Sequence, residues 1–551
     1  MKQKLLPIFV LFTAILSVIM ILSILDSSSK SANAAVQNID PVEGESPTSL
    51  MGEPVTVITV TSGLDPDNII GKKCADVSPN ECTLRRAVAE AVSLEEVEKP
   101  VLIKFDIPMT STQGYDKQLG VWKIQLKSNA ENGVFRRLNG QIIIDGTTQP
   151  GGRSSGPKII LTGPSVRKAA FIVDKDENVI RGLAFQNFDV SIYVNHDINL
   201  IEDNWFGLSD DGNSPYYFND EEDYGSGDSG ISLSELASNN QIQDNVFLGL
   251  YGVAAAIRGD SNTFSMNYIG TAADGTVPGK ETDLDLICTK VDWLGGGGIS
   301  VTNDDNIISD NIFAGLRQDI FIISTPPSAI QVGGDGHTIS NNQIGIDSAN
   351  NQVGVCGRGI YLISDPENNQ LTDNTIVYPG LSGISLNGAL YDANTLRRNT
   401  IKARSGWTEI EGNAKPETAI QLGAGLPDGF EYFIPAKVTE IDGKTIKGES
   451  GTGSPCAGCE IELFLDDMDL VTEALKSLAV VTANSDGKWT ATLSADLKND
   501  QGIRTTSTSM KFNIIPNMSA GTTTGLSVIY TESGGPGGGN QLFMPLVINK
   551  D

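Results

Sequence analysis

Histidine and positive charge are both scarce in this sequence. Only two of its 551 residues are histidine, His196 and His337, and 39 Lys and Arg stand against 68 Asp and Glu, which gives a formal net charge of -29. The histidine count excludes a histidine-rich metal site. A chain this acidic repels nucleic acids, anionic lipids and polyuronates unless a cation bridges them. We therefore expect neutral, cationic or metal-bridged partners and no nucleic acid.

Aromatic residues are also few, at 6%, whereas glycine is abundant, with 59 residues. This composition is typical of many short strands and turns, and the length suggests two or three structural units. The fold class predicted from the whole sequence is all-β.

One motif, Asn-x-apolar-x-x-Asn-x-apolar, recurs along the middle of the chain. Its copies are Asn199/Ile201/Asn204/Phe206, Asn240/Ile242/Asn245/Phe247, Asn262/Phe264/Asn267/Ile269, Asn306/Ile308/Asn311/Phe313, Asn369/Leu371/Asn374/Ile376 and Asn394/Leu396/Asn399/Ile401. Degenerate copies begin at Asn178, with Leu183 in the second asparagine slot, and at His337. Where two copies follow each other without an insertion, they are 21 residues (178 to 199) or 22 residues (240 to 262) apart. This period fits one coil of a parallel β-helix.

Each slot of the motif has a physical role in such a coil. The apolar residues point inward and stack on their equivalents one coil away, roughly 4.8 Å along the axis. The asparagines are expected at turns, because Asn tolerates left-handed backbone geometry and its amide can bond the same amide in the next coil. Glycines that open Gly-Ile segments at Gly230, Gly298, Gly359 and Gly383 are interpreted as turn residues before the next strand.

The N-terminal segment is the single long apolar run. Lys2 and Lys4 precede apolar residues 5–25, and Ala32-Asn33-Ala34 forms an A-x-A pattern before Ala35. Residues 1–34 are therefore predicted to be a secretory signal peptide, followed by a linker over 35–54. The run is also long enough to remain as an uncleaved anchor. No second membrane segment exists, so no membrane insertion is expected once the signal is cleaved.

A short helix is predicted to cap the solenoid, which we place at residues 55–430. A strand is expected over 55–60, and Leu84, Ala87, Val88, Ala91 and Val92 fall on one helical face, with Thr83 as N-cap. A cap protects the strand edges and core side chains of an open β-helix end from aggregation.

A β-sandwich is predicted over residues 431–532, with about seven short strands. Strands over 478–483 and 488–493 are joined at Ser485-Asp486-Gly487, which is a hairpin signal. Residues 533–551 comprise a glycine-rich flexible linker and an apolar tail over 542–548 that is too short to span a membrane.

The six cysteines fall in three pairs. After export, Cys74 with Cys82 and Cys456 with Cys459 are expected to form local disulfides, and Cys288 and Cys356 are the two that remain. The Cys456-x-x-Cys459 spacing also fits a redox motif. A redox motif would place its first cysteine at a helix N-terminus, however, whereas this one leads into an alternating strand at 460–464.

Two segments near the cap carry a family resemblance. The sequence CTLRRAV at residues 82–88 resembles the CSLREAI-type motif that opens a group of secreted bacterial right-handed parallel β-helix proteins, and IDGTTQPG at 144–151 is similar to another segment of that group. The group's Glu is Arg86 here, so only the Thr83 half of a capping box can form.

The C-terminal third carries the same resemblance. Cys456 to Cys459 resembles the CPGC-type entry to the Ig-like sandwich of these proteins, with Ala457 in place of Pro, and the tail resembles LPLV-type ends of some secreted bacterial proteins. The tail is interpreted either as a sorting signal or as a strand that pairs back onto the sandwich. The resemblance spans about residues 55–530 and implies a right-handed β-helix followed by an Ig-like sandwich, but no catalytic residue.

Some polysaccharide lyases and glycoside hydrolases are also parallel β-helices, so the predicted fold is compatible with catalysis. Asp304, Asp305, Asp335 and His337 superficially resemble the paired-Asp and Gly-His elements of polygalacturonases. Neither the companion Asn-Thr-Asp segment nor the Arg-Ile-Lys segment is present, and His337 occupies a ladder slot. A catalytic cluster is therefore not assigned.

Carboxylate-rich loops offer oxygen ligands to calcium. The candidates are Asp210, Asp211, Asp220, Glu222 and Asp223 in one insertion, and Asp466, Asp467 and Asp469 near the C-terminus. Neither group matches an EF-hand or a glycine-rich nonapeptide repeat, so the pattern favours solvated acidic loops over calcium sites.

Taken together, these features predict a secreted or cell-surface protein that binds a polysaccharide or another surface component and does not catalyse a reaction. The alternative is a polysaccharide lyase or hydrolase that acts in a groove of the β-helix. An enzyme should present a compact Asp/Arg/Lys cluster, and a binder an aromatic strip or a uniform polar face.

The first testable prediction concerns export. The mature protein should begin at Ala35, because the A-x-A pattern ends at Ala34. Intact-mass analysis of the secreted protein measures this directly, and secreted material that retains residues 5–25 would contradict it.

Overall fold

The structure is a computed structural model. It describes residues 52–65, 73–127, 134–164, 168–216, 229–278, 297–316, 328–386, 392–403, 419–422, 433–450, 456–469, 471–511, 518–531 and 535–536. The predicted signal segment 1–34 and the apolar tail lie outside these residues. No helix among the described residues is long and apolar enough to cross a membrane.

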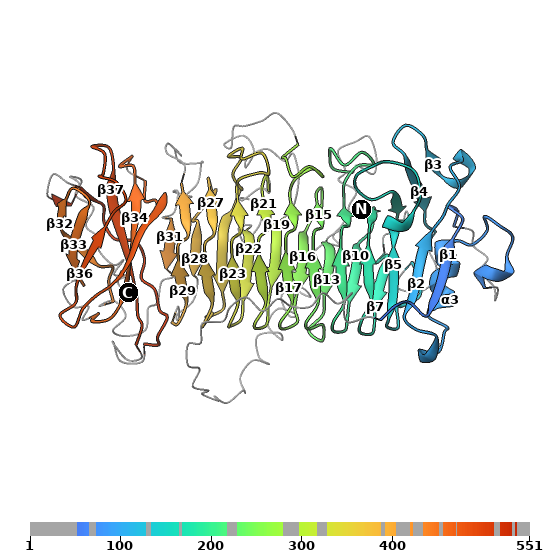
Figure 1. Ribbon diagram of the computed structural model, residues 1–551, viewed down its shortest axis with the longest axis horizontal. Helices are drawn as coiled ribbons and strands as arrows, with labels where there is room; N and C mark the ends of the chain where they lie inside the picture. Colours follow the sequence, from blue (N-terminus) through green and yellow to red (C-terminus); the bar gives the residue numbers. More distant parts are fainter. Residues whose placement is uncertain are drawn as a thin grey trace, which may run out of the picture. The chain divides into compact units, whose positions relative to one another are not determined.

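Three long sheets wind through the N-terminal part, and each coil contributes a strand to each of them (Figure 1). Sheet 1 contains β1 (Thr56–Val60), β2 (Val101–Phe105), β5 (Ile142–Asp145), β8 (Val179–Arg181), β11 (Leu200–Glu202), β14 (Gln241–Gln243), β17 (Thr263–Ser265), β20 (Ile307–Ser309), β23 (Thr338–Ser340), β26 (Gln370–Thr372) and β29 (Thr395–Arg397). Sheet 2 contains β3 (Tyr115–Asp116), β4 (Val121–Gln125), β6 (Ile159–Thr162), β9 (Leu183–Gln186), β12 (Trp205–Phe206), β15 (Val246–Phe247), β18 (Tyr268–Ile269), β21 (Ile312–Phe313), β24 (Gln343–Ile344), β27 (Thr375–Val377) and β30 (Thr400–Lys402).

Sheet 3 completes each coil. It contains β7 (Phe171–Val173), β10 (Val190–Val194), β13 (Ser229–Leu233), β16 (Val253–Ile257), β19 (Gly297–Val301), β22 (Ser328–Gly333), β25 (Arg358–Ile363), β28 (Ile384–Leu386) and β31 (Ile420–Leu422). Neighbouring strands pair in parallel, for example β14 with β17 and β15 with β18, except for the antiparallel pair of β3 and β4. The prediction of a parallel β-helix is confirmed.

The asparagines form two ladders along the stack. In the first, the backbone N–H and the Nδ2 of Asn199 donate to Oδ1 of Asn240 at 2.9 and 3.0 Å, and Asn240 repeats both bonds to Asn262. The second ladder passes through Asn204, Asn245, Asn267, Asn311, Asn342, Asn374 and Asn399, and none of these is more than 3% exposed. Each amide therefore fixes the register of the next coil.

One detail of the asparagine prediction is wrong. The left-handed backbone belongs to the residue before each ladder position, not to the asparagine itself: φ is 55° at Asp203, 55° at Asp244 and 58° at Asp310. The turn and the amide bond are thus made by consecutive residues. This leaves the ladder asparagine side chain free to point inward.

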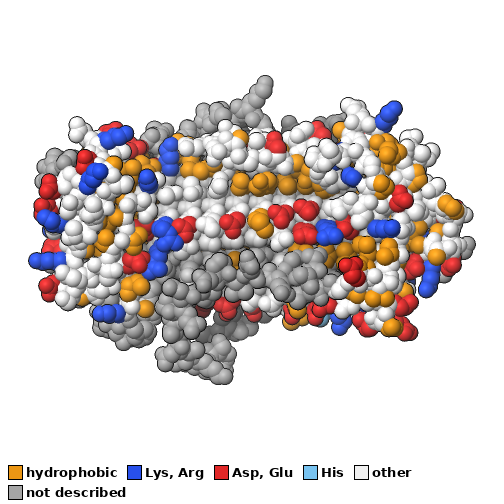
Figure 2. Space-filling view, in the orientation of Figure 1, with side chains coloured by type: hydrophobic (Ala, Val, Ile, Leu, Met, Phe, Trp, Pro, Cys, Tyr) orange, Lys and Arg blue, Asp and Glu red, His pale blue; other side chains and the backbone are white. Residues whose placement is uncertain are grey.

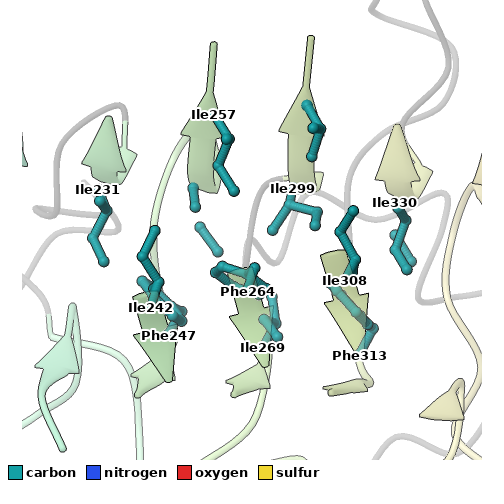
Figure 3. Packing of buried hydrophobic residues seen from close by; sticks show 14 of the residues in the cluster. Ile231, Ile242, Phe247, Ile257, Phe264, Ile269, Ile299, Ile308, Phe313 and Ile330 are labelled. Carbon is teal, nitrogen blue, oxygen red and sulfur yellow. The ribbon is translucent and has the colours of Figure 1, made fainter. Parts of the chain in front are cut away.

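The interior of the coil is filled by stacked apolar side chains, as predicted. Phe206 stacks on Phe185 and on Phe247 with ring centroids 5.1 and 4.8 Å apart, which matches the spacing between coils. Figure 3 shows the same columns farther along, where Ile242, Phe264 and Ile308 point into the space enclosed by the sheets.

The Gly-Ile segments have a different cause from the predicted one. Gly230, Gly298 and Gly359 lie within β13, β19 and β25, and their φ angles are not left-handed. A Cβ at Gly230 would lie 2.8 Å from the ring of Phe247, and one at Gly298 would lie 1.9 Å from the carbonyl oxygen of Ala329. These glycines are therefore required by close packing inside the coil and not by a turn.

The N-terminal end is covered by α3 (Leu84–Ala91), the only α-helix among the described residues. Thr83 caps it by accepting the backbone N–H of Arg86 at 3.2 Å, and Leu84, Ala87, Val88 and Ala91 are buried, as predicted. The disulfide Cys74–Cys82 holds the preceding loop. Short 3-10 helices occupy Cys74–Asp76, Glu96–Glu98, Ser111–Gln113 and Gly146–Thr148.

The C-terminal part forms two antiparallel sheets. One has the order β32 (Lys437–Asp442), β33 (Thr445–Glu449), β36 (Lys488–Thr492); the other has β35 (Lys476–Thr482), β34 (Glu460–Asp466), β37 (Gly502–Thr508), β38 (Tyr530–Thr531), β39 (Gly535–Pro536). The disulfide Cys456–Cys459 precedes β34. Cys356 is also disulfide-bonded, and Cys288 lies outside the described residues. The assignment of this part as Ig-like stays a prediction.

Two predicted features of this part are wrong. The Ser485-Asp486-Gly487 turn does not close a hairpin, because β35 pairs with β34 and β36 pairs with β33, so the turn carries the chain from one sheet to the other. Two residues of the predicted flexible linker, Gly535 and Pro536, form β39 and pair with β38.

The C-terminal part also pairs with the last coils of the β-helix. Ala474 exchanges two backbone hydrogen bonds with Ile401 of β30 at 2.8 and 3.0 Å, and the N–H of Arg398 donates to both carboxylate oxygens of Glu462 at 3.0 Å. Backbone groups that the final coil would leave unpaired are thereby satisfied.

The ladder yields a stability prediction. Asn311 donates to the carbonyl oxygen of Phe264 and to Oδ1 of Asn342 at 2.9 and 3.0 Å, and it accepts the N–H of Asn267 at 2.9 Å. Asn311→Ala leaves these buried partners unsatisfied and should lower the free energy of unfolding by about 1–3 kcal/mol. Chemical denaturation measures this loss in the free energy of unfolding.

The matched control is Gln343→Ala, an exposed residue of the next coil. Its cost should stay within about 0.5 kcal/mol. Equal losses for the two variants would contradict the structural role of the ladder.

Candidate functional surfaces

His337 replaces asparagine in the first ladder and has no exposed surface. Its Nδ1 accepts the backbone N–H of Asn306 at 3.1 Å, and its Nε2 lies 3.3 Å from the carbonyl oxygen of Gly333. The neutral ring therefore carries its proton on Nε2 and donates it to Gly333. Burial lowers the pKa of His337. The side chain is enclosed by the coil stack, where it supports register.

Asp304 and Asp335 belong to a row that lies two positions before the first ladder, which we call the turn column. Its acidic members are Asp176, Asp197, Asp260, Asp304, Asp335, Glu367 and Asp392, with Ser238 in one coil. The carboxylate of Asp304 accepts the N–H of Asp335 at 2.9 Å, and that of Asp335 accepts the N–H of Glu367 at 2.7 Å. The two catalytic candidates thus repeat one structural role and form no separate acid–base pair.

Asp305 has another position in the same coil. It is exposed, its φ is 59°, and its N–H donates to the carbonyl oxygen of Asp335 at 2.9 Å. It is the left-handed residue that precedes ladder residue Asn306. Of the four catalytic candidates, His337 is enclosed, Asp304 and Asp335 hold neighbouring coils, and Asp305 forms the turn.

A second charged row, the corner column, immediately precedes the second ladder. Its charged members are Asp203, Asp244, Asp310, Asp373 and Arg398. Figure 2 shows a row of acidic side chains along this face, with basic side chains toward its two ends. Burial raises the pKa of Asp203 and of Asp244, and neighbouring negative charges, Asp145 for the first and Asp203 for the second, add to the effect.

Between the two columns lies the outward face of sheet 1, three residues wide. From β17 to β29 we call the outward side chains of this face the polar strip. They are Thr263, Ser265, Ile307, Ser309, Thr338, Ser340, Gln370, Thr372, Thr395 and Arg397. All except Ser265 are exposed or half-buried. The strip is mainly polar, although it includes the exposed Ile307 and the cation Arg397. The acidic turn column lies on one side of it, and on the other side the corner column supplies Asp310 and Asp373 among Met266, Asn341 and Arg398.

A compact polar cluster lies on the outward side of sheet 2. Lys123 of β4 forms ion pairs with Asp116, at 3.2 Å, and with Asp210, which also accepts a hydrogen bond from Gln186 at 2.9 Å. The guanidinium of Arg153 lies 4.4 Å from the ring centroid of Trp205 and donates to the carbonyl oxygen of Asp210 at 2.7 Å. The calcium candidate Asp210 is therefore neutralised by lysine.

The neighbouring candidate Asp211 has a local role. Its carboxylate accepts the hydroxyl of Ser209 at 2.7 Å and the N–H of Asn213 at 3.0 Å, which closes a turn and lowers its pKa. This turn packs over Trp205, since a Cβ at Gly212 would lie 2.5 Å from the indole ring. Asp220, Glu222 and Asp223 lie outside the described residues.

The C-terminal acidic group is divided by the structure. Asp466 is fully buried and pairs with Arg504. Asp467 and Asp469 are exposed, and with Glu473 they form a group whose carboxylate oxygens all lie within 4.8 Å of one another. Burial and then the charges of Asp467, Asp469 and Asp466 raise the pKa of Glu473 to about 8.

The sequence interpretation missed three of these residues. Lys123 precedes the repeat and carries no motif, so nothing in the sequence places it beside Asp210. Arg181 of β8 forms ion pairs with Asp145 and Glu202 at 2.7 and 3.3 Å. These contacts can be predicted from the sequence only by aligning the outward-facing positions of successive coils. Glu473 could have been found from its spacing in Asp467-x-Asp469-x-x-x-Glu473.

Comparisons with known proteins identify no family. No family model matches the chain, and no curated protein matches it. Among solved structures, the mannuronan C-5 epimerase AlgE6 A-module of Azotobacter vinelandii is 10% identical over 62% of this chain and 95% of that chain, with a TM-score of 0.28. A mutant tailspike protein of E. coli bacteriophage HK620 in complex with a hexasaccharide is 10% identical over 82% and 92%, with a TM-score of 0.29. The Dettilon tailspike protein is 13% identical over 83% and 79%, with a TM-score of 0.34.

The ladder position of His337 yields a second prediction. His337→Asn should retain full stability, because asparagine restores the residue used in neighbouring coils, whereas His337→Ala should lose about 1–3 kcal/mol. A loss in His337→Asn as large as that in His337→Ala would show that the imidazole has a role beyond the ladder.

The same position gives a pH dependence. The pKa of His337 is lower in the folded than in the unfolded chain. The unfolded chain therefore binds more protons, and stability present above an unfolded pKa of about 6.5 is lost as pH falls toward the folded pKa. Melting curves of wild type and His337→Asn should diverge on acidification below about pH 6.5, with wild type the less stable.

Proposed function

We propose that this protein is a secreted or cell-surface β-helix that binds an extended glycan along the polar strip without cleaving it. The observation that carries the proposal is the repetition of hydroxyl and amide side chains, coil after coil, between the acidic turn column and the Asp310 and Asp373 carboxylates of the corner column. Sugar hydroxyls donate to carboxylates in charge-assisted hydrogen bonds and exchange bonds with Thr, Ser and Gln side chains.

The geometry of the strip favours a linear polymer. Equivalent groups recur at roughly 4.8 Å, so an extended chain meets similar partners at each coil. Each contact on a flat, wet surface is weak, and affinity would come from many contacts made together. A polymer is therefore a better ligand than a single sugar.

The charge of the strip selects the class of glycan. The turn column is acidic, and the corner column beside the strip adds Asp310 and Asp373 against the single cation Arg398. Burial and the charges of Asp335 and Asp392 raise the pKa of Glu367. A polyuronate would add further negative charge to this surface, whereas a neutral or amine-bearing glycan would not. We infer that neutral and amine-bearing glycans are preferred.

Export is part of the proposal. The disulfides Cys74–Cys82 and Cys456–Cys459 fit an oxidising compartment. They support the interpretation of residues 1–34 as a signal peptide that is removed after translocation.

A second candidate function is glycoside hydrolysis at the corner column. Asp203 and Asp244 follow paired residues of neighbouring strands, their pKa values are raised, and Arg181 lies beside Asp203. A protonated and an ionised carboxyl on either side of a glycosidic bond is the arrangement that such enzymes use. This pair, and not Asp304 with Asp335, is the site to test for cleavage.

Binding is tested with soluble chitosan, a neutral β-glucan and polygalacturonate by affinity electrophoresis and calorimetry. We expect binding to the first two and none to polygalacturonate in the absence of divalent cations. The double variant Asp310→Asn with Thr338→Ala should weaken binding about tenfold, since each hydrogen bond contributes about 0.5–1.5 kcal/mol.

The matched control is Asp486→Asn with Thr490→Ala, which makes the same two changes at exposed positions of the C-terminal part. Its affinity should equal that of wild type. Equal weakening by both double variants would refute the assignment of the strip. Release of reducing ends that is lost in Asp203→Asn or Asp244→Asn would instead establish the hydrolase.

A further inference from the structure

The loop between β34 and β35 brings three carboxylates together at the junction with the β-helix. Asp467 and Asp469 lie on the loop, Glu473 follows just before the segment that pairs with β30, and their oxygens lie within 4.8 Å of one another. The turn itself is held by the backbone, since the N–H of Asp469 donates to Asp467 at 3.2 Å and the N–H of Val471 donates to Asp469 at 2.9 Å. Three carboxyl groups are thereby held close together.

Glu473 is the residue that its surroundings leave unexplained. Its side chain is 2% exposed, and its Oε2 has no hydrogen-bond partner. The carboxyl group accepts one backbone hydrogen bond, from Ala403, but a buried carboxylate that is only partly satisfied costs folding free energy unless a proton or a cation neutralises it. Within the described part of the chain, none of the three carboxylates forms an ion pair, because Arg504 is bound to Asp466.

We propose that Asp467, Asp469 and Glu473 bind a calcium ion that joins the C-terminal part to the last coil of the β-helix. All the donors are carboxylate oxygens, which hard cations prefer to nitrogen or sulfur. Calcium binds oxygen at 2.3–2.6 Å, so ligands across the ion lie up to about 5 Å apart. Three oxygens within 4.8 Å of one another can therefore surround one calcium ion, and water would complete the coordination.

The position of Glu473 gives the ion a structural consequence. The next residue, Ala474, exchanges backbone hydrogen bonds with Ile401 of β30, and the carbonyl oxygen of Thr472 accepts the N–H of Ala419 at 3.3 Å. The ion would therefore hold the loop against the chain segment that closes the β-helix. Anything that binds the folded state alone stabilises it, so calcium should stabilise this closure. The inference is independent of the proposed glycan binding.

The experiment uses the full secreted protein, stripped with EDTA and titrated with CaCl2 alone by calorimetry and by thermal melting, with MgCl2 as comparison. We expect calcium to bind and to raise the melting temperature, and magnesium to bind at least about tenfold more weakly. The double variant Asp467→Asn with Asp469→Asn keeps the side-chain oxygens that accept backbone N–H groups in the turn, but it removes two negative charges. This double variant should lose at least about tenfold in calcium affinity.

Glu473→Gln separates a ligand from a merely structural residue. It should abolish the calcium-dependent rise in melting temperature, yet in EDTA it should melt no lower than wild type, because a neutral amide replaces a buried carboxyl group whose raised pKa already favours the neutral, protonated form. Asp486→Asn, an exposed acid outside the group, should leave both measurements unchanged. The proposal is overturned if calcium has no effect on wild type at millimolar concentration, or if its effect persists unchanged in Glu473→Gln and in the double variant.

Discussion

The buried amide ladder is the constraint on which the rest of this structure depends. A slip of one residue between coils would move every inward side chain to the outward face, so register has to be specified strongly. The two asparagine columns do this, because each side-chain oxygen receives both the backbone N–H and the amide of its neighbour, as at Asn267 and Asn311. A single incorrect register would leave several buried polar groups without partners. Once the register is fixed, the phenylalanine rings of successive coils stack on one another, and glycine is needed within the strands where a Cβ would collide with a neighbour.

The same constraint produces the charge pattern of the surface. Because equivalent positions stack at coil spacing, an acidic residue that suits one turn recurs as a column of like charges, which repel one another. Two devices limit the cost. In the turn column five carboxylates, those of Asp176, Asp197, Asp260, Asp304 and Asp335, each accept a backbone N–H of the next coil. In the corner column Arg398 binds Asp373 through two hydrogen bonds of 2.7 Å. The acidity that remains is a property of the whole face.

The sequence predicted the fold well because the repeat is local. The spacing of asparagine and apolar residues is sufficient to assign strands, inward faces and the capping helix at Thr83, and these agree with the structure. Features that depend on partners distant in sequence were not predictable in the same way. The Ser485-Asp486-Gly487 turn predicts that the chain reverses, but it does not identify the strand with which the next strand pairs. Lys123 and Asp210 are distant in the sequence, and they meet only when the coils are stacked. The catalytic candidates Asp304, Asp335 and His337 occupy positions of the repeat, and their side chains hold neighbouring coils together.

The open end of a β-helix explains why the C-terminal part carries unusual charges. A final coil has no successor to receive its amide bonds, so its partners must come from outside the repeat. Glu462 receives the N–H of Arg398, and Ala474 pairs with Ile401. Between these contacts lie two buried acids. Asp466 forms an ion pair with Arg504, whereas Glu473 forms no ion pair with any of the described residues. Burying an acid without a cation is unfavourable in itself, and its place beside Asp467 and Asp469 aggravates the repulsion. A proton or, as we propose, a calcium ion relieves this repulsion at the point where the C-terminal part pairs with the last coil of the β-helix.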